Sequence, residues 1–302
     1  MNTFWQGVLP AITTPFLPNG EVDHAFLAHH VDLMMQAGST GIVPLGSLGE
    51  TATLTFDEKR AVLRTVVKAV AGRGAVVPGV AALATADAVR FAQMAAEENC
   101  SGLMVLPPYV YSTDWREMKT HVSAVIAATA LPCMLYNNPI AYRTDFSAVQ
   151  MLELAAAHPN LEAVKESSAD VRRIAAIKSA LGTRLHILVG VDDLIVEGIA
   201  AGATGWVAGL VNAFPKESIA LFKLARAGRW AEAEPLYHWF LPLLRMDVVP
   251  KFVQLIKLVQ SHVDMGSPAV RAPRLVLEGE ELDQANAVIK QALVTKPALP
   301  AV

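Results

Sequence analysis

The 302-residue sequence has few cysteines, few charged residues and no recognisable export signal. Its two cysteines, Cys100 and Cys133, cannot build a disulfide framework and lack metal-ligand spacing. This usage is typical of a reducing compartment. The first residues contain no basic stretch followed by an apolar one, so we expect no signal peptide. The sequence therefore predicts a cytoplasmic protein.

Charge is scarce and balanced. Charged residues make up 18% of the chain, and the formal net charge is −3. Binding to nucleic acid needs clustered Lys and Arg side chains, and no run of like charge is present. The composition therefore argues against a nucleic-acid partner. A small anionic substrate is compatible with it, because such a substrate needs only one local site.

Long uninterrupted apolar helices are also missing, although apolar residues make up 53% of the chain. The most apolar uncharged stretch covers residues 198–215, and four glycines interrupt it. This pattern predicts a helix end, a turn and a short strand in place of a membrane helix. Strands buried on both faces explain the high mean hydropathy of +0.37. We therefore expect no membrane association.

Short apolar runs alternate with longer amphipathic runs over roughly the first 210 residues. Alternating strands and helices predict a parallel sheet. Eight such units in about 210 residues fit a closed (β/α)8 TIM barrel. A doubly wound sheet is the alternative, but no Gly-x-Gly-x-x-Gly motif follows the first strand. The predicted strands are 7–16, 41–46, 75–80, 102–107, 132–137, 161–167, 185–190 and 204–209, and the helices are 24–37, 56–72, 85–99, 114–129, 146–158, 170–181 and 193–202.

The remaining part of the chain has only helical periodicity. No Ser- or Gly-rich linker precedes it, which argues against an independent domain. We therefore predict a barrel over residues 1–212 and a C-terminal helical extension, packed on the barrel, over residues 213–302. The helices expected there cover 215–228, 230–260 with a break at Pro242 or Pro250, and 280–296.

A lysine closes the sixth predicted strand, at the end of a barrel where active sites lie. The two-residue period places Lys165 on the same face as Leu161 and Ala163. Inside a dry barrel an ammonium group loses hydration, so its pKa falls. The neutral amine can then attack a ketone and form a Schiff base. The competing interpretation is a strand-end lysine that reaches solvent.

Other strand ends carry polar or small residues. Tyr136 ends the fifth strand, where it either relays protons or is a core tyrosine bonded to the backbone. The loop 46–49 either offers N–H groups and the Ser47 hydroxyl to an anion or is an ordinary turn. Asp192 and Asp193, after the seventh strand, either bind substrate hydroxyls or cap a helix. The histidines have no metal-binding spacing, so we expect neither a metal nor a cofactor.

Four motifs occur in a characteristic order and spacing. With them, the sequence resembles the dihydrodipicolinate synthase / N-acetylneuraminate lyase family over residues 5–296. The resemblance implies a (β/α)8 barrel with a C-terminal helical extension, assembled as a homotetramer (a dimer of dimers). It also implies an imine between Lys165 and a 2-oxo acid, with Tyr136 as the proton-transfer residue. The motifs are Thr13-Thr14-Pro15-Phe16, Gly46-Ser47-Leu48-Gly49-Glu50, Tyr136-Asn137-Asn138-Pro139 and Lys165-Glu166-Ser167-Ser168.

The resemblance also assigns substrate-binding positions. The loop with Gly46, Ser47 and Leu48 holds the substrate carboxylate, and Val207 lines the pocket. The segment with Gly190 and Asp192 is more similar to the lyase branch, in which it contacts a polyhydroxylated chain.

Two further positions match the synthase pattern only after a shift. Tyr111 takes the place of a tyrosine that the neighbouring subunit contributes in the synthases, after a one-residue shift. Arg143 takes the place of the synthase arginine, after a two-residue insertion. Moreover, Leu48 stands where the synthases have a second hydroxyl residue.

These departures favour a catabolic enzyme over the biosynthetic synthase. We therefore predict a Schiff-base-forming (class I) lyase or aldolase acting on a small 2-oxo acid. The alternatives are a dehydratase of a 2-keto-3-deoxy sugar acid, a deaminase of pyrroline-4-hydroxy-2-carboxylate, a true dihydrodipicolinate synthase, and a non-catalytic 2-oxo acid sensor.

Overall fold

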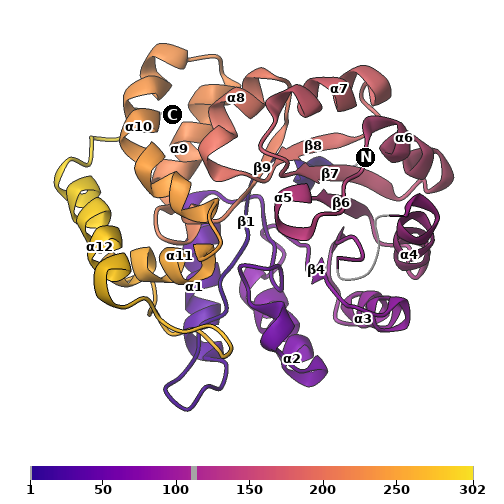
Figure 1. The fold of residues 1–302 in the computed structure, drawn as a ribbon, viewed down its shortest axis with the longest axis horizontal. Coiled ribbons are helices and arrows are strands. Elements are labelled where there is room, and N and C mark those ends of the chain that lie inside the picture. The colour runs from indigo at the N-terminus through magenta and orange to yellow at the C-terminus, as the bar shows by residue number, and fades with distance from the viewer. Residues whose placement is uncertain (1, 110–113, 302) are drawn as a thin grey trace.

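The strands form a curled parallel sheet with helices outside it. The computed structural model describes residues 2–109 and 114–301. In this part of the chain, seven strands pair in the order β1-β9-β8-β7-β6-β5-β4, and β2 pairs with β3. Figure 1 shows the strands at the centre, with α2, α3, α4, α6 and α7 on the outside. The predicted α/β class and parallel pairing are confirmed. The strands are β1 (Gly7–Pro10), β2 (Gly41–Ile42), β3 (Ala75–Val76), β4 (Gly79–Val80), β5 (Leu103–Val105), β6 (Cys133–Asn137), β7 (Leu161–Glu166), β8 (His186–Val189) and β9 (Gly205–Ala208).

The predicted third strand, 75–80, is divided in the structure. Pro78 has no N–H to donate, so the regular ladder is interrupted there. Ahead of the proline, β3 pairs with β2, and after it β4 pairs with β5. A hydrogen bond from Val43 N to Pro10 O, at 2.8 Å, joins the first two predicted strands just beyond their regular parts.

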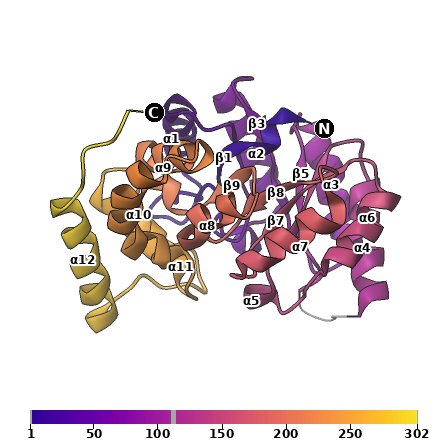
Figure 2. The ribbon, with the colours of Figure 1, turned by 90° about the horizontal axis from the view of Figure 1, so that it is seen from above.

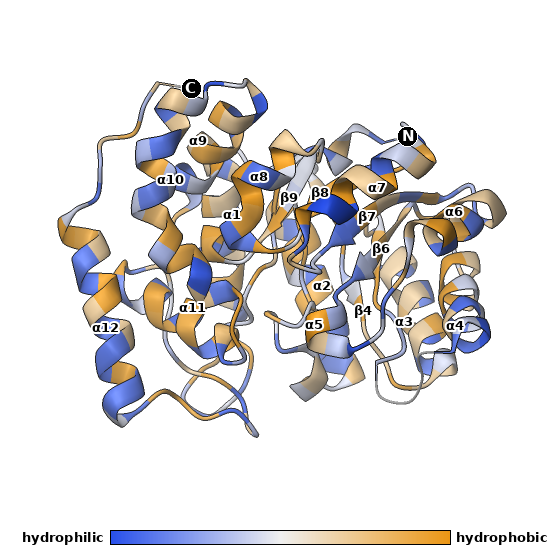
Figure 3. Cartoon of the chain, turned by 45° about the horizontal axis from the view of Figure 1, so that its top comes forward, coloured by the Kyte–Doolittle hydropathy of each residue, from blue (hydrophilic) through white to orange (hydrophobic). Residues whose placement is uncertain are grey.

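Local sequence signals account for the ends of some helices. Thr55 forms a capping box with Glu58 at the start of α2. Gly38 ends α1 with a φ of 106°, a conformation that favours glycine. Figure 3 shows hydrophilic and hydrophobic residues alternating along outer helices such as α4 and α12. The helices are α1 (His24–Ala37), α2 (Phe56–Val70), α3 (Thr85–Glu97), α4 (Trp115–Ala127), α5 (Pro139–Tyr142), α6 (Ala148–Ala157), α7 (Val171–Leu181), α8 (Ile195–Ala200), α9 (Pro215–Arg226), α10 (Trp230–Leu244), α11 (Phe252–His262) and α12 (Gly279–Val294).

The helices after β9 gather on one side of the molecule, opposite α4 and α6 (Figure 2). Helix α9 contacts α1, α8 and α10, and α10 in turn contacts α12. The expected break in the long helix falls at residues 245–251, beside Pro250, whereas Pro242 lies inside α10. The short 3-10 helix η5 (Arg245–Asp247) fills this break. It contacts η3 (Asp192–Leu194), which follows β8.

The core consists of the strands and the inner faces of the helices. Trp5 and Trp206 are fully buried beside apolar strand residues. The strands read as continuous apolar runs because both of their faces are covered. In residues 2–109 and 114–301, no helix is both long and apolar enough to cross a membrane.

Candidate active site

The adjacent strands β6 and β7 place two pairs of side chains at their carboxyl ends. Their register pairs Tyr136 with Lys165 and Asn137 with Glu166. The Asn137 amide donates to Glu166 Oε2 at 3.0 Å, and Asn137 Oδ1 accepts from Phe146 N at 3.0 Å. The hydrogen bond between Asn137 and Glu166 joins the two strand ends. Because successive residues of a strand face opposite ways, Tyr136 and Lys165 lie on the other face of the sheet. Lys165 Nζ lies 4.3 Å from the centroid of the Tyr136 ring.

A cavity of about 770 Å³ lies at these strand ends. This volume is in the usual range for small-molecule sites. Seven of the residues that the sequence predicted for the site line it, from five different strand ends or loops. They are Gly46, Ser47, Leu48, Tyr136, Lys165, Gly190 and Val207.

Two predicted residues, Asp192 and Arg143, do not line the cavity, and a third lies outside the described residues. Asp192 is fully buried, and its carboxylate accepts hydrogen bonds from Trp206 Nε1, Gly209 N and Leu210 N. It therefore has internal partners in place of a substrate. Arg143 is exposed just after α5, with its N–H donating to Pro139 O. Tyr111 lies outside the described residues.

Burial changes the chemistry of Lys165. Only 7% of this residue is exposed. Loss of hydration lowers its pKa from 10.5 to about 8, although the carboxylates of Asp247 and Asp192 act in the opposite direction. About one-tenth of the amine is therefore neutral, and nucleophilic, at pH 7, far more than for an ordinary lysine.

Tyr136 is held by a neighbour on its own loop. The Asn138 amide donates to the phenol oxygen at 2.9 Å. Burial raises the pKa of Tyr136 above 10, so the phenol is protonated at neutral pH. A phenol in this position can donate a proton to a molecule in the cavity and take one back.

Tyr142 is a lining residue that the sequence reasoning missed. Its hydroxyl forms a hydrogen bond with Ser47 Oγ. Its ring stands edge-on to Tyr136, with the ring centroids 5.7 Å apart, and lies 5.3 Å from Tyr109. Burial raises the pKa of Tyr142, so it too is protonated. The one available signal was the two-residue insertion ahead of Arg143, because Tyr142 lies within that longer loop.

Gly190 contributes space. A Cβ atom at this position would lie 2.1 Å from Ser167 Oγ and 2.5 Å from Lys165 Cε. Any larger residue would therefore displace the Lys165 side chain. The strand-end glycine allows the lysine to lie close to the backbone of β8.

The protein-family comparison matches the chain over nearly its full length. The model of the dihydrodipicolinate synthetase family matches residues 4–292. The chain belongs to the dihydrodipicolinate synthetase family. The resemblance seen in the four motifs is thereby confirmed. Members of this family are lyases or condensing enzymes that act on pyruvate through a lysine Schiff base.

Three relatives illustrate the similarity. The chain is 34% identical to a 4-hydroxy-tetrahydrodipicolinate synthase of Sorangium cellulosum (strain So ce56), covering 92% of this chain and 93% of the relative. It superposes with a TM-score of 0.90 on the 4-hydroxy-tetrahydrodipicolinate synthase of Methylacidiphilum fumariolicum SolV, at 27% identity and with 96% and 97% of the two chains covered. The dihydrodipicolinate synthase of Acinetobacter baumannii, solved with pyruvate, gives a TM-score of 0.90 at 25% identity, with 96% and 99% covered.

The C-terminal helices of this family member also reach the cavity. Asp247 in η5 and Arg274, between α11 and α12, line it together with Asp193 in η3. The sequence reasoning had Asp193 as a candidate for binding substrate hydroxyls, but it missed Asp247 and Arg274. Asp247 and Arg274 belong to segments predicted to lie outside the barrel, and no local pattern reveals a contact over such a distance along the chain.

A buried ion pair joins the substrate-side loop to the C-terminal helices. Lys257 Nζ lies 2.6 Å from Glu50 Oε1, and both side chains are almost fully buried. Glu50 Oε2 also accepts from Arg271 N at 3.1 Å and lies 3.8 Å from Arg274 Nη1. The loop that carries Ser47 and Leu48 is thus anchored from the far end of the chain.

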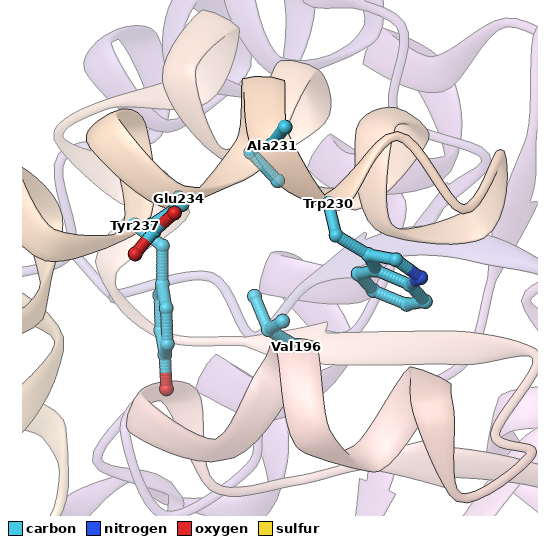
Figure 4. A pocket seen from close by; sticks show the side chains of 6 residues that line it. Val196, Trp230, Ala231, Glu234 and Tyr237 are labelled. Carbon is cyan, nitrogen blue, oxygen red and sulfur yellow. The ribbon is translucent and has the colours of Figure 1, made fainter.

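A second pocket, of about 380 Å³, lies between α8 and α10 (Figure 4). Val196, Trp230 and Tyr237 line it, and it shares no lining residue with the cavity around Lys165. Tyr237 donates its hydroxyl to Asp193 O and Glu197. The phenol is therefore already engaged, and this pocket holds no nucleophile comparable to Lys165.

Proposed function

We propose that this protein is a class I lyase or aldolase with a catabolic role, which forms a Schiff base between Lys165 and a small 2-oxo acid. One observation carries the proposal. A buried lysine with a pKa of about 8 lines a cavity beside a protonated tyrosine and a serine hydroxyl. Family membership supports the same chemistry.

The proposed cycle uses groups on the cavity wall. The carboxylate of the 2-oxo acid binds the Ser47 hydroxyl and the backbone N–H groups of the loop with Gly46 and Leu48. The neutral Lys165 amine attacks the keto carbon, and water leaves to give an iminium. The iminium accepts the electron pair when a C–C bond breaks or a β-substituent departs. Tyr136 moves the protons.

Tyr142 orients Ser47 in this scheme, since the two hydroxyls are hydrogen-bonded. Val207 forms an apolar part of the wall, and Gly190 leaves room for the lysine. Asp192 does not line the cavity, but its carboxylate accepts hydrogen bonds from Gly209 N and Leu210 N and so stabilises this part of the site.

Condensation is the second candidate reaction, because the similar proteins from Sorangium and Methylacidiphilum are named 4-hydroxy-tetrahydrodipicolinate synthases. Dehydration and deamination of 2-oxo or cyclic imino acids proceed from the same iminium. We favour a catabolic reaction because Leu48 lines the cavity where a second hydroxyl residue is expected in the synthases.

We further propose that residues 1–212 form a closed (β/α)8 barrel with residues 213–302 as its helical extension. The hydrogen bond between Val43 N and Pro10 O, which joins the first two strands, supports closure. We also propose a homotetramer (a dimer of dimers) in the cytoplasm. Two free, buried cysteines are compatible with that compartment. Sedimentation analysis tests the assembly, and a monomer would contradict it.

Trapping the imine tests the function. Borohydride treatment in the presence of pyruvate should reduce the adduct, add the corresponding mass, and leave it on the peptide that contains Lys165. Lys165→Ala should abolish the adduct, because the nucleophile is lost. The matched control is Lys290→Ala, which removes an exposed lysine on α12. An adduct that persists in Lys165→Ala would refute the proposed role.

A panel of 2-oxo acids then separates the reactions. Each acid that traps on Lys165 is incubated without borohydride, and its products are identified by mass. Pyruvate release indicates aldol cleavage, whereas loss of water or ammonia indicates elimination. If no 2-oxo acid traps, the alternative of a non-catalytic sensor is tested by measuring binding directly.

A further inference from the structure

An acidic side chain from the C-terminal helices shares the cavity with Lys165. Asp247 lies in η5, between α10 and α11, and is partly exposed to the cavity. Its carboxyl group packs tightly against β9, because a Cβ at Gly209 would lie 2.0 Å from Asp247 Oδ1. The absence of a side chain at position 209 therefore lets Asp247 approach the strand ends closely.

Among the residues that the structure describes, the carboxyl group of Asp247 has no hydrogen-bond or ion-pair partner. Within residues 2–109 and 114–301, Asp247 takes part in no side-chain hydrogen bond and no ion pair, unlike Asp192 directly behind it. Asp192 has its acceptors filled by three N–H groups and does not line the cavity. Of these two carboxyl groups, only Asp247 is free to exchange a proton with a bound molecule.

We propose that Asp247 is a second catalytic residue, which donates the proton with which the carbinolamine hydroxyl leaves as water and then remains beside the iminium as its counter-ion. This inference rests on the proposed Schiff-base function. The neutral lysine amine, the ketone and the Asp247 carboxylic acid give the iminium, the Asp247 carboxylate and water. One C=O bond is replaced by one C=N bond, and the net charge does not change.

The charges around Asp247 favour the state that this step requires. Asp192 and Asp193 face it from η3, and Lys165 and Tyr136 from the strand ends. On its own helix, Arg245 lies 4.0 Å from Asp193 Oδ2, with which it pairs. Loss of hydration and the Asp192 charge hold the pKa of Asp247 well above its usual range, whereas the pKa of Asp192 is raised to about 6. The proton is therefore kept on Asp247 while Asp192 is ionised at pH 7.

The pH profile distinguishes this role from a structural one. Imine formation should be fastest in the pH range in which Lys165 and Asp247 carry one titratable proton between them. The rate should fall on the alkaline side, when that last proton is lost. Without a carboxyl group at position 247, the rate should rise as Lys165 loses its proton and then stay level.

The experiment compares Asp247→Asn with the unsubstituted protein and with Asp264→Asn, an isosteric change at an exposed position after α11. Each protein is mixed with pyruvate between pH 6 and 10 and quenched into borohydride at timed intervals, and the adduct is quantified by intact mass. We expect Asp247→Asn to slow adduct formation at pH 7 about 100-fold, as for loss of a general acid, and to lose the alkaline fall. Asp264→Asn should behave like the unsubstituted protein.

Two results would overturn the inference while leaving the proposed function intact. One is an Asp247→Asn protein with the original rate and pH profile. The other is a slower protein whose alkaline fall persists, which indicates a structural effect. If Asp247→Asn does not fold, Asp247→Ala is tested with added formate, which should restore part of the rate. Absence of an adduct in the unsubstituted protein would instead refute the proposed function itself.

Discussion

Two hydroxyl groups meet at the wall of the cavity that Lys165 lines, and one of them comes from a segment that the sequence motifs do not cover. Ser47 is expected to bind the substrate carboxylate, and the hydroxyl of Tyr142 is its hydrogen-bond partner. A serine hydroxyl that rotates freely is a poorer donor than one held in place, because binding must then order it. The orientation of Ser47 therefore depends on Tyr142.

Replacing Tyr142 with Phe should weaken substrate use without preventing imine formation. The ring contacts with Tyr136 and Tyr109 are retained, but the Ser47 hydroxyl loses its partner. The loss of about 1 kcal/mol for one hydrogen bond corresponds to a roughly fivefold lower kcat/KM. Steady-state kinetics with the best-trapping 2-oxo acid measure it. Tyr109→Phe is the control, and equal effects in both variants would contradict the role of Tyr142.

At this scale, the sequence predicted the residues whose signal is local. Lys165 and Tyr136 each close an apolar strand, and strand alternation decides which way they face. Tyr142 ends the four-residue helix α5, which no periodicity indicates. Asp192 followed the right strand, but its carboxylate turns to Trp206 and to backbone N–H groups behind the cavity.

The elements themselves were predictable because strands and helices differ in their apolar period. Predicted helices such as 24–37 and 170–181 agree with α1 and α7 within a residue. The division of the strand 75–80 was not predicted. Its apolar run is continuous, and only the missing N–H of Pro78 separates β3 from β4.

The contact between the loop after β2 and helix α11 depends on one buried ion pair. Glu50→Gln should destabilise the fold, because Lys257 would then be left buried without its counter-charge. Breaking a buried pair on one side typically costs about 3–5 kcal/mol. The free energy of unfolding from urea titration measures the loss. The same substitution should raise KM, since the loop with Ser47 loses its anchor.

An exposed ion pair on the same helices provides the control. Lys251 and Glu281 form a salt bridge whose side chains are about half exposed. Glu281→Gln should therefore change the free energy of unfolding by less than about 1 kcal/mol. If Glu50→Gln were equally mild, the pair with Lys257 would not be what holds the loop.

The molecule as a whole is joined by a buried histidine. His30 in α1 is 1% exposed, and its Nε2 lies 3.0 Å from Asn212 Oδ1 and 3.3 Å from the Gln260 amide of α11. Burial lowers the pKa of His30 from 6.5 to about 4. The start, middle and end of the chain therefore meet at a group that must stay neutral.

Stability should consequently depend on pH between about 4 and 6.5. In this window the unfolded chain binds a proton at His30 and the folded protein does not, so stability rises with pH and is lost as the pH falls. The difference between pH 7 and pH 4 should be about 3 kcal/mol for this residue. Urea titrations across that range measure the slope. His30→Asn should flatten it, and His238→Asn, at an exposed position on α10, should not.

The sequence predicted C-terminal helices but not their part in the site. Their apolar faces indicate that these helices pack against another part of the molecule, but they do not identify that part. Asp247 and Arg274 line the cavity only because η5 meets η3 and because the segment after α11 meets Glu50. Contacts between such distant segments leave no trace in local sequence patterns.

The anchor of Glu50 also sets an order of events on the ribosome. Arg271, whose backbone N–H bonds Glu50, is made 221 residues after it. At usual rates of synthesis, this delay is on the order of 10–40 s. During that time the strands can pair, but the loop with Ser47 still lacks the hydrogen bond between Arg271 N and Glu50. A nascent chain stalled before Lys257 would therefore contain Lys165 while the loop with Ser47 still lacks its contacts to the C-terminal helices.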